Sequence, residues 1–254
     1  MKKKGNNMMT SCFLMAAVLF LDFDVDALSA DLHVETGMAY IEQGLPDKAM
    51  GEFITALEIS DQAYEAHLGL ARIAVINCSW TTAEEEYLIY MELRPENYRA
   101  PLEMAEMLLT VYGRYPDALV FAETALSLAP LNGECWLVLA DTEGRLGNIE
   151  VATTWYRRIF TENVELADEA RVRMGSLLFQ HGDLPEAREV LLPAASSGKA
   201  EAHHILAVMY LEQNDELRAT DSINRYLYLE PNGHWADSAR MCLDELLSGT
   251  VELR

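Results

Sequence analysis

The sequence predicts an all-α protein in which one helix pair is repeated about six times. Small residues recur inside amphipathic segments at steps of 34, 35, 34, 35 and 32 residues. Proline closes several of these segments, as Pro95, Pro130 and Pro231 do. No stretch of strictly alternating apolar and polar residues interrupts the pattern, so no strand is expected. The recurring small residues are Ala49, Ala83, Ala118, Ala152, Ala187 and Ala219.

Residues 1–30 have the three-part layout of a secretory signal peptide. Lysines open the chain, an apolar stretch runs from Cys12 to Leu21, and small residues follow. The apolar stretch is about half the roughly 20 residues that a membrane-spanning helix needs. Cys12 precedes this stretch, whereas the cysteine of a bacterial lipoprotein signal follows it, so no lipidation is expected. We expect cleavage after Ser29 or Ala30, with an uncleaved tether or a misplaced start of the chain as the alternatives.

Local turn signals set the ends of the helices in residues 31–233. Gly44 and Gly147 stand between the two helices of a pair, where glycine permits the left-handed backbone that ends a helix. Pro46, Pro116 and Pro185 then fall in the first turn of the following helix, where a missing N–H costs nothing. The expected pairs are 31–44/46–60, 64–76/81–93, 98–112/116–128, 133–146/148–162, 168–181/184–196 and 200–213/215–229. A last amphipathic helix, about 234–248 within a C-terminal segment 234–254, is expected to cap the final repeat.

The repeat resembles the tetratricopeptide repeat, whose 34-residue unit has a W-x2-L-G-x2-Y helix, an A-x3-F helix and a closing proline. The resemblance covers residues 30–233, and six successive copies of the repeat pattern follow one another at this spacing. The third repeat carries an extra residue, and the first and fifth lack the closing proline. The best matching positions are Gly37, Tyr40, Ala49 and Phe53, then Trp136, Leu139, Ala140, Ala152 and Tyr156, and finally Leu206, Ala207, Tyr210 and Ala219.

This resemblance implies a right-handed α-solenoid whose first helices line a concave groove. Such a groove suits an extended peptide or a helix with apolar anchors. The alternative for any one of its residues is contact with a neighbouring repeat in the solenoid core. The expected partner-binding residues are Met38, Leu68, Arg72, Arg99, Leu102, Glu106, Leu137, Asp141, Arg145, Phe179, His204 and Val208. Further groove positions are Val34, Ile41, Val75, Leu109, Val172, Ser176 and Leu211.

Charge narrows the choice of partner. The chain has 19 Lys and Arg against 41 Asp and Glu, a net charge of −22. Such a surface repels the nucleic acid backbone and anionic lipid, so neither is expected as a partner. We expect a protein or peptide partner and, as a separate expectation, no small-molecule ligand. Repeats that grip the carboxylate of a chaperone tail use Lys and Asn in their first helices. Val34, Met38, Leu68 and Arg72 hold those positions here, so this type of clamp is not expected.

The sequence has no pattern that predicts catalysis, a cofactor or a metal site. His203 and His204 are adjacent on a helix, so their rings point about 100° apart and are interpreted as structural. The segment 193–200 has only part of a phosphate-binding loop, with Ala200 in place of the required Ser or Thr. Cys78, Cys135 and Cys242 fit neither a disulfide framework nor a zinc site and are expected to be buried free thiols, although one bridge between two of them stays open.

We therefore predict a non-enzymatic adaptor or assembly factor, exported to the periplasm or cell envelope of a bacterium. Secretion, pilus assembly and assembly of envelope complexes are the settings that the resemblance implies. A scaffold subunit of a larger enzyme or transport complex is the alternative. A hydrolase would need a buried carboxylate or histidine with a shifted pKa in the groove.

Overall fold

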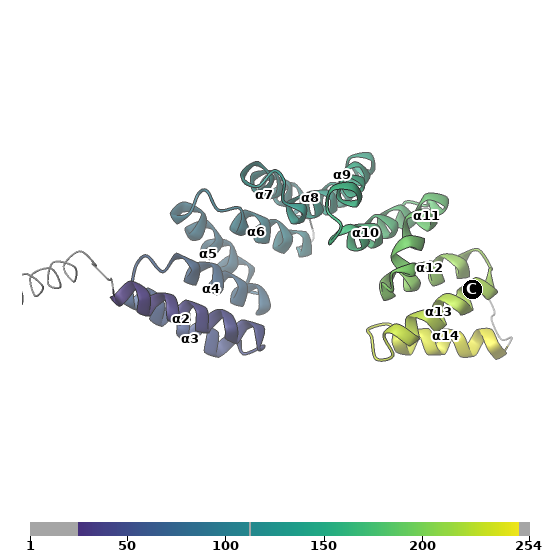
Figure 1. Ribbon diagram of the computed structural model, residues 1–254, viewed down its shortest axis with the longest axis horizontal. Helices are drawn as coiled ribbons and strands as arrows, with labels where there is room; N and C mark the ends of the chain where they lie inside the picture. Colours follow the sequence, from purple (N-terminus) through teal and green to yellow (C-terminus); the bar gives the residue numbers. More distant parts are fainter. Residues whose placement is uncertain (1–24, 112, 249–254) are drawn as a thin grey trace, which may run out of the picture. The chain divides into compact units, whose positions relative to one another are not determined.

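The computed structural model describes residues 25–111 and 113–248, and within them every regular element is an α-helix (Figure 1). The thirteen helices described are six antiparallel pairs followed by one single helix. They are α2 (Val25–Glu42), α3 (Pro46–Ile59), α4 (Tyr64–Ile76), α5 (Trp80–Leu93), α6 (Arg99–Thr110), α7 (Tyr115–Leu128), α8 (Gly133–Arg145), α9 (Ile149–Glu162), α10 (Ala167–Gln180), α11 (Leu184–Ser196), α12 (Ala200–Glu212), α13 (Glu216–Leu229) and α14 (Ala236–Ser248).

The predicted all-α repeat fold is confirmed, and the boundaries of α3 to α14 lie within about two residues of those expected from the sequence. The exception is α2, which begins at Val25 instead of residue 31. Ala30 within it is only 1% exposed and packs on Ala49 and Phe53. Residues 1–24, which hold most of the predicted signal peptide, lie outside the described residues.

The chain divides into two compact units at residues 96 and 97. Unit 1 contains α2 to α5, and unit 2 contains α6 to α14. Each repeat-defining alanine is fully buried because it lies where the two helices of its pair meet, and a side chain larger than methyl would separate them. In unit 1, the ring of Phe53 fills the space beside Gly37 and Gly69, where a Cβ on either glycine would overlap it.

The tight turns inside the pairs use the left-handed backbone expected there. Gly44, Gly147 and Gly182 have φ values of 70°, 85° and 83°. The second and sixth repeats place Cys78 and Asn214 at this position, with φ values of 54° and 56°. Cys78 is exposed, so the expectation of a buried thiol is wrong for this residue, because the turn that it occupies faces solvent. Among the described residues, Cys78, Cys135 and Cys242 are all free thiols.

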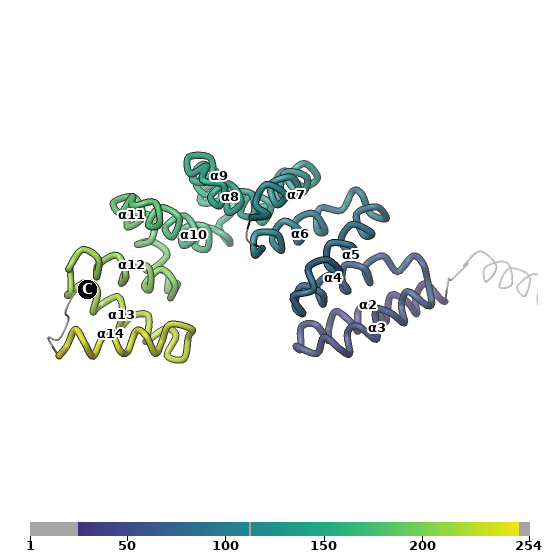
Figure 2. The backbone as a smooth tube through the Cα atoms, turned by 180° about the vertical axis from the view of Figure 1, so that it is seen from behind, coloured from purple at the N-terminus to yellow at the C-terminus, as the bar shows by residue number. Residues whose placement is uncertain are grey.

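The last helix packs on the end of unit 2, with α13 lying between α12 and α14 (Figure 2). Trp235 and Ala236, just before and at the start of α14, join Ala200 and Tyr226 in a small apolar cluster. Farther along α14, Met241 and Leu247 are 66% and 72% exposed. None of the helices that the structure describes is both long enough and apolar enough to cross a bilayer.

Candidate functional site: a cleft in unit 2

Unit 2 contains an open cleft of about 760 Å³. Its walls come chiefly from the first helix of each pair, namely α6, α8, α10 and α12, while Tyr156 reaches in from α9 and Trp235 closes one end. We call it the unit 2 cleft. It is lined by Leu109, Thr110, Asp141, Gly144, Arg145, Tyr156, Val172, Arg173, Ser176, Leu177, Phe179, Gln180, His181, Glu201, His204, Ile205, Val208 and Trp235.

A hydrogen-bonded charge network lies at the α8–α10 side of this cleft. Both carboxylate oxygens of Asp141 are engaged, since Oδ1 accepts from the hydroxyl of Tyr156 and Oδ2 from Arg173. The other end of the Arg173 guanidinium donates to Glu169 one helical turn earlier. The network therefore links α8, α9 and α10 and fixes the orientation of Arg173.

Burial dominates the electrostatics of this network. It raises the pKa of Asp141, while Arg173 and the Tyr156 hydroxyl act in the opposite direction. Burial raises the pKa of Tyr156 as well, with Asp141 as the next cause, so this phenol stays protonated and donates. Burial acts to lower the pKa of Arg173, but Asp141 and Glu169 outweigh it and the pKa is raised. A carboxylate held in this way fixes the positions of Tyr156 and Arg173.

The rest of the cleft combines an apolar surface with one available cation. Val172, Phe179 and Val208 are partly exposed along α10 and α12. Arg145 is exposed and makes no ion pair with any residue in the described part of the chain. Apolar side chains beside a free guanidinium can hold a segment that has apolar anchors and an acceptor such as a carboxylate or carbonyl.

His204 and Trp235 form the far wall of the cleft. Their rings stack with centroids 4.1 Å apart and an interplanar angle of 11°. Burial lowers the pKa of His204, so the neutral ring is favoured. Tyr226 supports the stack, because its hydroxyl accepts from the backbone N–H of Trp235 at 3.0 Å. This wall is therefore built by packing across three helices.

Five of the twelve expected partner-binding residues line the cleft, namely Asp141, Arg145, Phe179, His204 and Val208. Leu109, Val172 and Ser176, which the sequence also placed in the groove, line it with them. They come from alternate helices of unit 2, as a groove formed by first helices requires.

Three expected residues belong instead to the core. Leu68, Leu102 and Leu137 are 0%, 5% and 5% exposed, so they have almost no surface to offer a partner. Each of these leucines lies on the first helix of a pair, and that helix packs between neighbouring helices. The leucine side chains point into the apolar core between the helices.

The remaining four expected residues are not among those that line the cleft. Met38 and Arg72 belong to unit 1, where Arg72 Nη1 donates to the sulfur of Met38 at 3.4 Å. Arg99 and Glu106 lie exposed on α6. None of the four lines the unit 2 cleft.

Sequence reasoning missed Arg173, Tyr156 and Trp235. Arg173 directly follows Val172, which was expected in the groove, so a wider helical face would have included it. Tyr156 occupies a repeat position assigned to packing, and only its hydroxyl reaches the cleft wall. Trp235 was assigned to the capping helix, and only its stacking on His204 reveals that it also closes the cleft.

Comparison with known proteins agrees with this architecture. A family model described as tetratricopeptide repeat matches residues 172–234. A comparison of the sequence with curated proteins found no match. Three solved structures, which are 13% to 21% identical to this chain, show a shared fold.

Pseudomonas aeruginosa PilF is 18% identical, with a TM-score of 0.68, and the match covers 89% of this chain and 99% of that one. PilW, described as a widely conserved type IV pilus biogenesis factor, is 13% identical, with a TM-score of 0.72 over 83% of this chain and 98% of that one. YrrB, described as a tetratricopeptide repeat protein with an unusual peptide-binding site, is 21% identical, with a TM-score of 0.50 over 74% and 97%. The family match over residues 172–234 and these solved structures show that the chain shares the fold of tetratricopeptide repeat proteins.

Proposed function

We propose that this protein is a non-enzymatic adaptor or assembly factor that holds a segment of a partner protein in the unit 2 cleft. The observation that carries the proposal is the composition of the cleft, in which Phe179, Val208 and Trp235 offer apolar surface beside the unpaired Arg145. Its volume of about 760 Å³ suits a few side chains of a bound segment rather than a whole domain.

The titratable groups of the cleft support binding over catalysis. Asp141 accepts hydrogen bonds from Tyr156 and Arg173, and the raised pKa of Tyr156 keeps that hydroxyl protonated rather than nucleophilic. His204 is stacked on Trp235 and has no hydrogen-bond partner among the described residues. A general base needs a partner that orients it, and His204 has none among the described residues, while the hydrogen bonds of Asp141 fit a structural role.

We further propose that the protein acts in the bacterial cell envelope, in secretion, pilus assembly or the assembly of an envelope complex. The signal-like arrangement of residues 1–30 supports export. The similarity in fold to PilF and to the pilus biogenesis factor PilW is consistent with such a setting.

Affinity capture with matched variants tests the cleft. Val208→Glu places a charge on the apolar wall, whereas Val151→Glu makes the same change on α9 at a residue that does not line the cleft. From the envelope fraction of the source organism, the wild type and Val151→Glu should retain the same protein and Val208→Glu should lose it. Circular dichroism should show equal helicity for all three.

A second step identifies the bound segment. Synthetic peptides that tile the captured protein should include one that binds wild type with at least about tenfold higher affinity than Val208→Glu, a difference of about 1.4 kcal/mol. Arg145→Gln should weaken the same peptide if the segment carries an acceptor for the guanidinium. A partner that all variants retain equally would place binding outside the cleft and contradict the proposal.

A further inference from the structure

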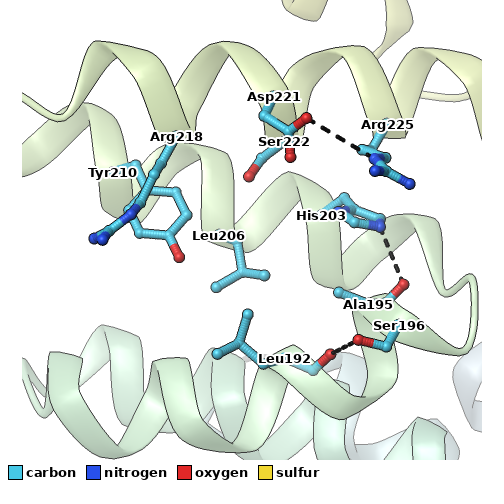
Figure 3. Close-up of a pocket in the computed structure, with 10 residues that line it drawn as sticks. All are labelled: Leu192, Ala195, Ser196, His203, Leu206, Tyr210, Arg218, Asp221, Ser222 and Arg225. Carbon is cyan, nitrogen blue, oxygen red and sulfur yellow. Dashed lines mark hydrogen bonds and ion pairs between the residues drawn. The ribbon is translucent and has the colours of Figure 1, made fainter.

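A second cavity lies on unit 2 between α11, α12 and α13, and it shares no lining residue with the unit 2 cleft. Its volume is about 300 Å³. Figure 3 shows His203 on α12 below a row of side chains on α13. We call this cavity the α13 pocket. It is lined by Leu192, Ala195, Ser196, His203, Leu206, Tyr210, Arg218, Asp221, Ser222 and Arg225.

The repeat register explains why a cavity is present here. Histidine occurs 16 residues before the buried alanine in three repeats, at His33, His67 and His203. The facing residue, 19 positions farther along, is Glu52 in the first repeat and Glu86 in the second. The corresponding residue in the sixth repeat is Ser222. The three middle repeats fill these two positions with Leu102 and Phe121, Trp136 and Trp155, and Arg171 and Val190.

The first two repeats therefore contain a built-in histidine–carboxylate pair. Nδ1 of His33 lies 2.6 Å from Glu52, and Nδ1 of His67 lies 2.7 Å from Glu86. The sixth repeat keeps the histidine but has lost the carboxylate, because serine is too short to carry one to the ring. The α13 pocket occupies the space that a longer side chain would fill.

His203 has one ring nitrogen engaged and one available. Its Nε2 lies 3.1 Å from the carbonyl oxygen of Ala195. Because a carbonyl oxygen only accepts, Nε2 must carry the proton and donate. Within the described part of the chain Nδ1 has no hydrogen-bond partner. This is the same atom that contacts the glutamate in the first two repeats.

The other polar groups of the α13 pocket favour an anion. Ser222 is 5% exposed, and its hydroxyl makes no hydrogen bond to a described residue. Arg225 lies 3.9 Å from Asp221, and Arg218 lies 3.3 Å from Asp215. These are long, exposed ion pairs of the kind that contribute little to stability, so a ligand can replace them at small cost. Two arginines and the single carboxylate of Asp221 line this pocket, and burial lowers the pKa of His203, so its ring is neutral until an anion binds beside it.

We propose that the α13 pocket binds a carboxylate group, which takes the place that Glu52 and Glu86 hold beside their histidines. The donors are Nδ1 of a protonated His203, the hydroxyl of Ser222 and the guanidinium of Arg225. The carboxylate can belong to a small organic acid or to an acidic side chain of a partner protein. This site is independent of the proposed role of the unit 2 cleft.

The first test uses glutarate, a dicarboxylate that resembles a glutamate side chain, and the full chain. Binding is followed by the ring resonances of His203 in nuclear magnetic resonance spectra. Glutarate should shift these resonances in a saturable way and raise the pKa of His203, because a bound anion stabilises the imidazolium. Arg225→Gln should weaken binding at least about tenfold. Arg188→Gln, the same change on an exposed α11 residue outside the pocket, should not weaken it.

The second test supplies the missing carboxylate from the chain itself. Ser222→Glu should recreate the pair seen at His33 and His67, raise the pKa of His203 without ligand and abolish the binding of glutarate. Ser222→Gln has nearly the same size and no charge, so it should block binding without raising that pKa. Val208→Glu in the unit 2 cleft should bind glutarate as the wild type does.

Several results would overturn the proposal. One is a linear, non-saturable response to glutarate in the wild type, and another is undiminished binding by Arg225→Gln. Stronger binding of inorganic phosphate than of glutarate would overturn the assignment to a carboxylate.

A blocked Gly-Glu-Gly peptide distinguishes the two possible sources of the carboxylate, a small organic acid and an acidic side chain of a partner protein. If it binds as tightly as glutarate, an acidic protein side chain is supported, and if only glutarate binds, a small organic acid is supported.

Discussion

Gly69 shows how one absent side chain sets the packing of unit 1. A Cβ at this residue would overlap the ring of Phe53, which already fills the space beside Gly37. Phe53 is fully buried and cannot withdraw without opening a cavity. We expect Gly69→Ala to destabilise the protein by about 1–3 kcal/mol, as overpacking does. The measurement is the free energy of unfolding in urea.

Gly51 is the control for this substitution. It also lies in a helix, α3, but no atom lies within 4 Å of an added Cβ. Gly51→Ala should therefore stabilise the protein by about 0.5–1 kcal/mol, through helix propensity alone. If both variants changed stability by the same amount and sign, the packing of Phe53 against Gly69 would not be the cause.

His204 gives the protein a defined response to pH. Burial lowers its pKa below the ordinary value of 6.5. Its contribution to stability is therefore complete above pH 6.5 and is lost as the pH falls through the lowered pKa. His204→Phe keeps an aromatic ring beside Trp235 but cannot be protonated. The melting temperature of wild type should fall more between pH 7 and pH 5 than that of His204→Phe, and parallel curves would contradict this account.

The turns that join the two helices of a pair show where the sequence predicted the backbone conformation correctly and where it did not. Gly44 and Gly147 take the left-handed backbone that the sequence predicted for them. Cys78 occupies the equivalent turn with φ of 54°, although cysteine gives no sign of this conformation. The positive φ is required because the chain must reverse direction within a short turn. This requirement holds for whichever residue occupies the position.

Cys78→Gly should therefore stabilise unit 1. A left-handed conformation costs a residue with a Cβ roughly 1–2 kcal/mol, and the greater freedom of glycine in the unfolded chain returns part of this. We expect a net gain of up to about 1 kcal/mol in thermal or urea unfolding. Cys78→Ala removes the thiol but keeps the Cβ, so it should give no such gain. Equal stability of the two variants would assign the effect to the thiol instead.

The helices could be predicted well because their ends depend on local chemistry. Proline, glycine and the recurring alanine act within a few residues, and the boundaries of α3 to α14 follow them closely. The cleft could be predicted only in part, because helical phase gives the direction of a side chain but not how closely the next helix covers it. Leu137 and Asp141 lie one turn apart on α8, yet the first is core and the second lines the cleft.

At the scale of the whole molecule, the start of α2 bears on the predicted processing of the chain. Ala30 is buried against the first repeat, whereas Val25 and Leu28 before it are 69% and 56% exposed. Cleavage after Ser29 would keep the buried residue, and cleavage after Ala30 would remove it. We therefore expect a mature chain that begins at Ala30, which mass spectrometry of the exported protein would show. A mature chain that begins at Asp31 would mean that the first repeat does not need Ala30.

The net charge of −22 acts on the molecule as a whole and gives the last prediction. Unlike charges are paired locally, as in Arg114 with Asp117 and Arg171 with Asp168, but 41 acidic residues far outnumber the 19 basic residues.

Raising the ionic strength from about 0.01 M to 0.15 M shortens the screening length from about 30 Å to 8 Å. This weakens the exposed ion pairs, each worth about 0–1 kcal/mol, but it also relieves repulsion among all the unpaired acids. Because the large net negative charge makes long-range repulsion exceed attraction, the melting temperature should rise with sodium chloride over this range. Glu85→Gln, which removes one exposed charge, should reduce the slope, whereas a melting temperature that falls with salt would show that the local ion pairs dominate.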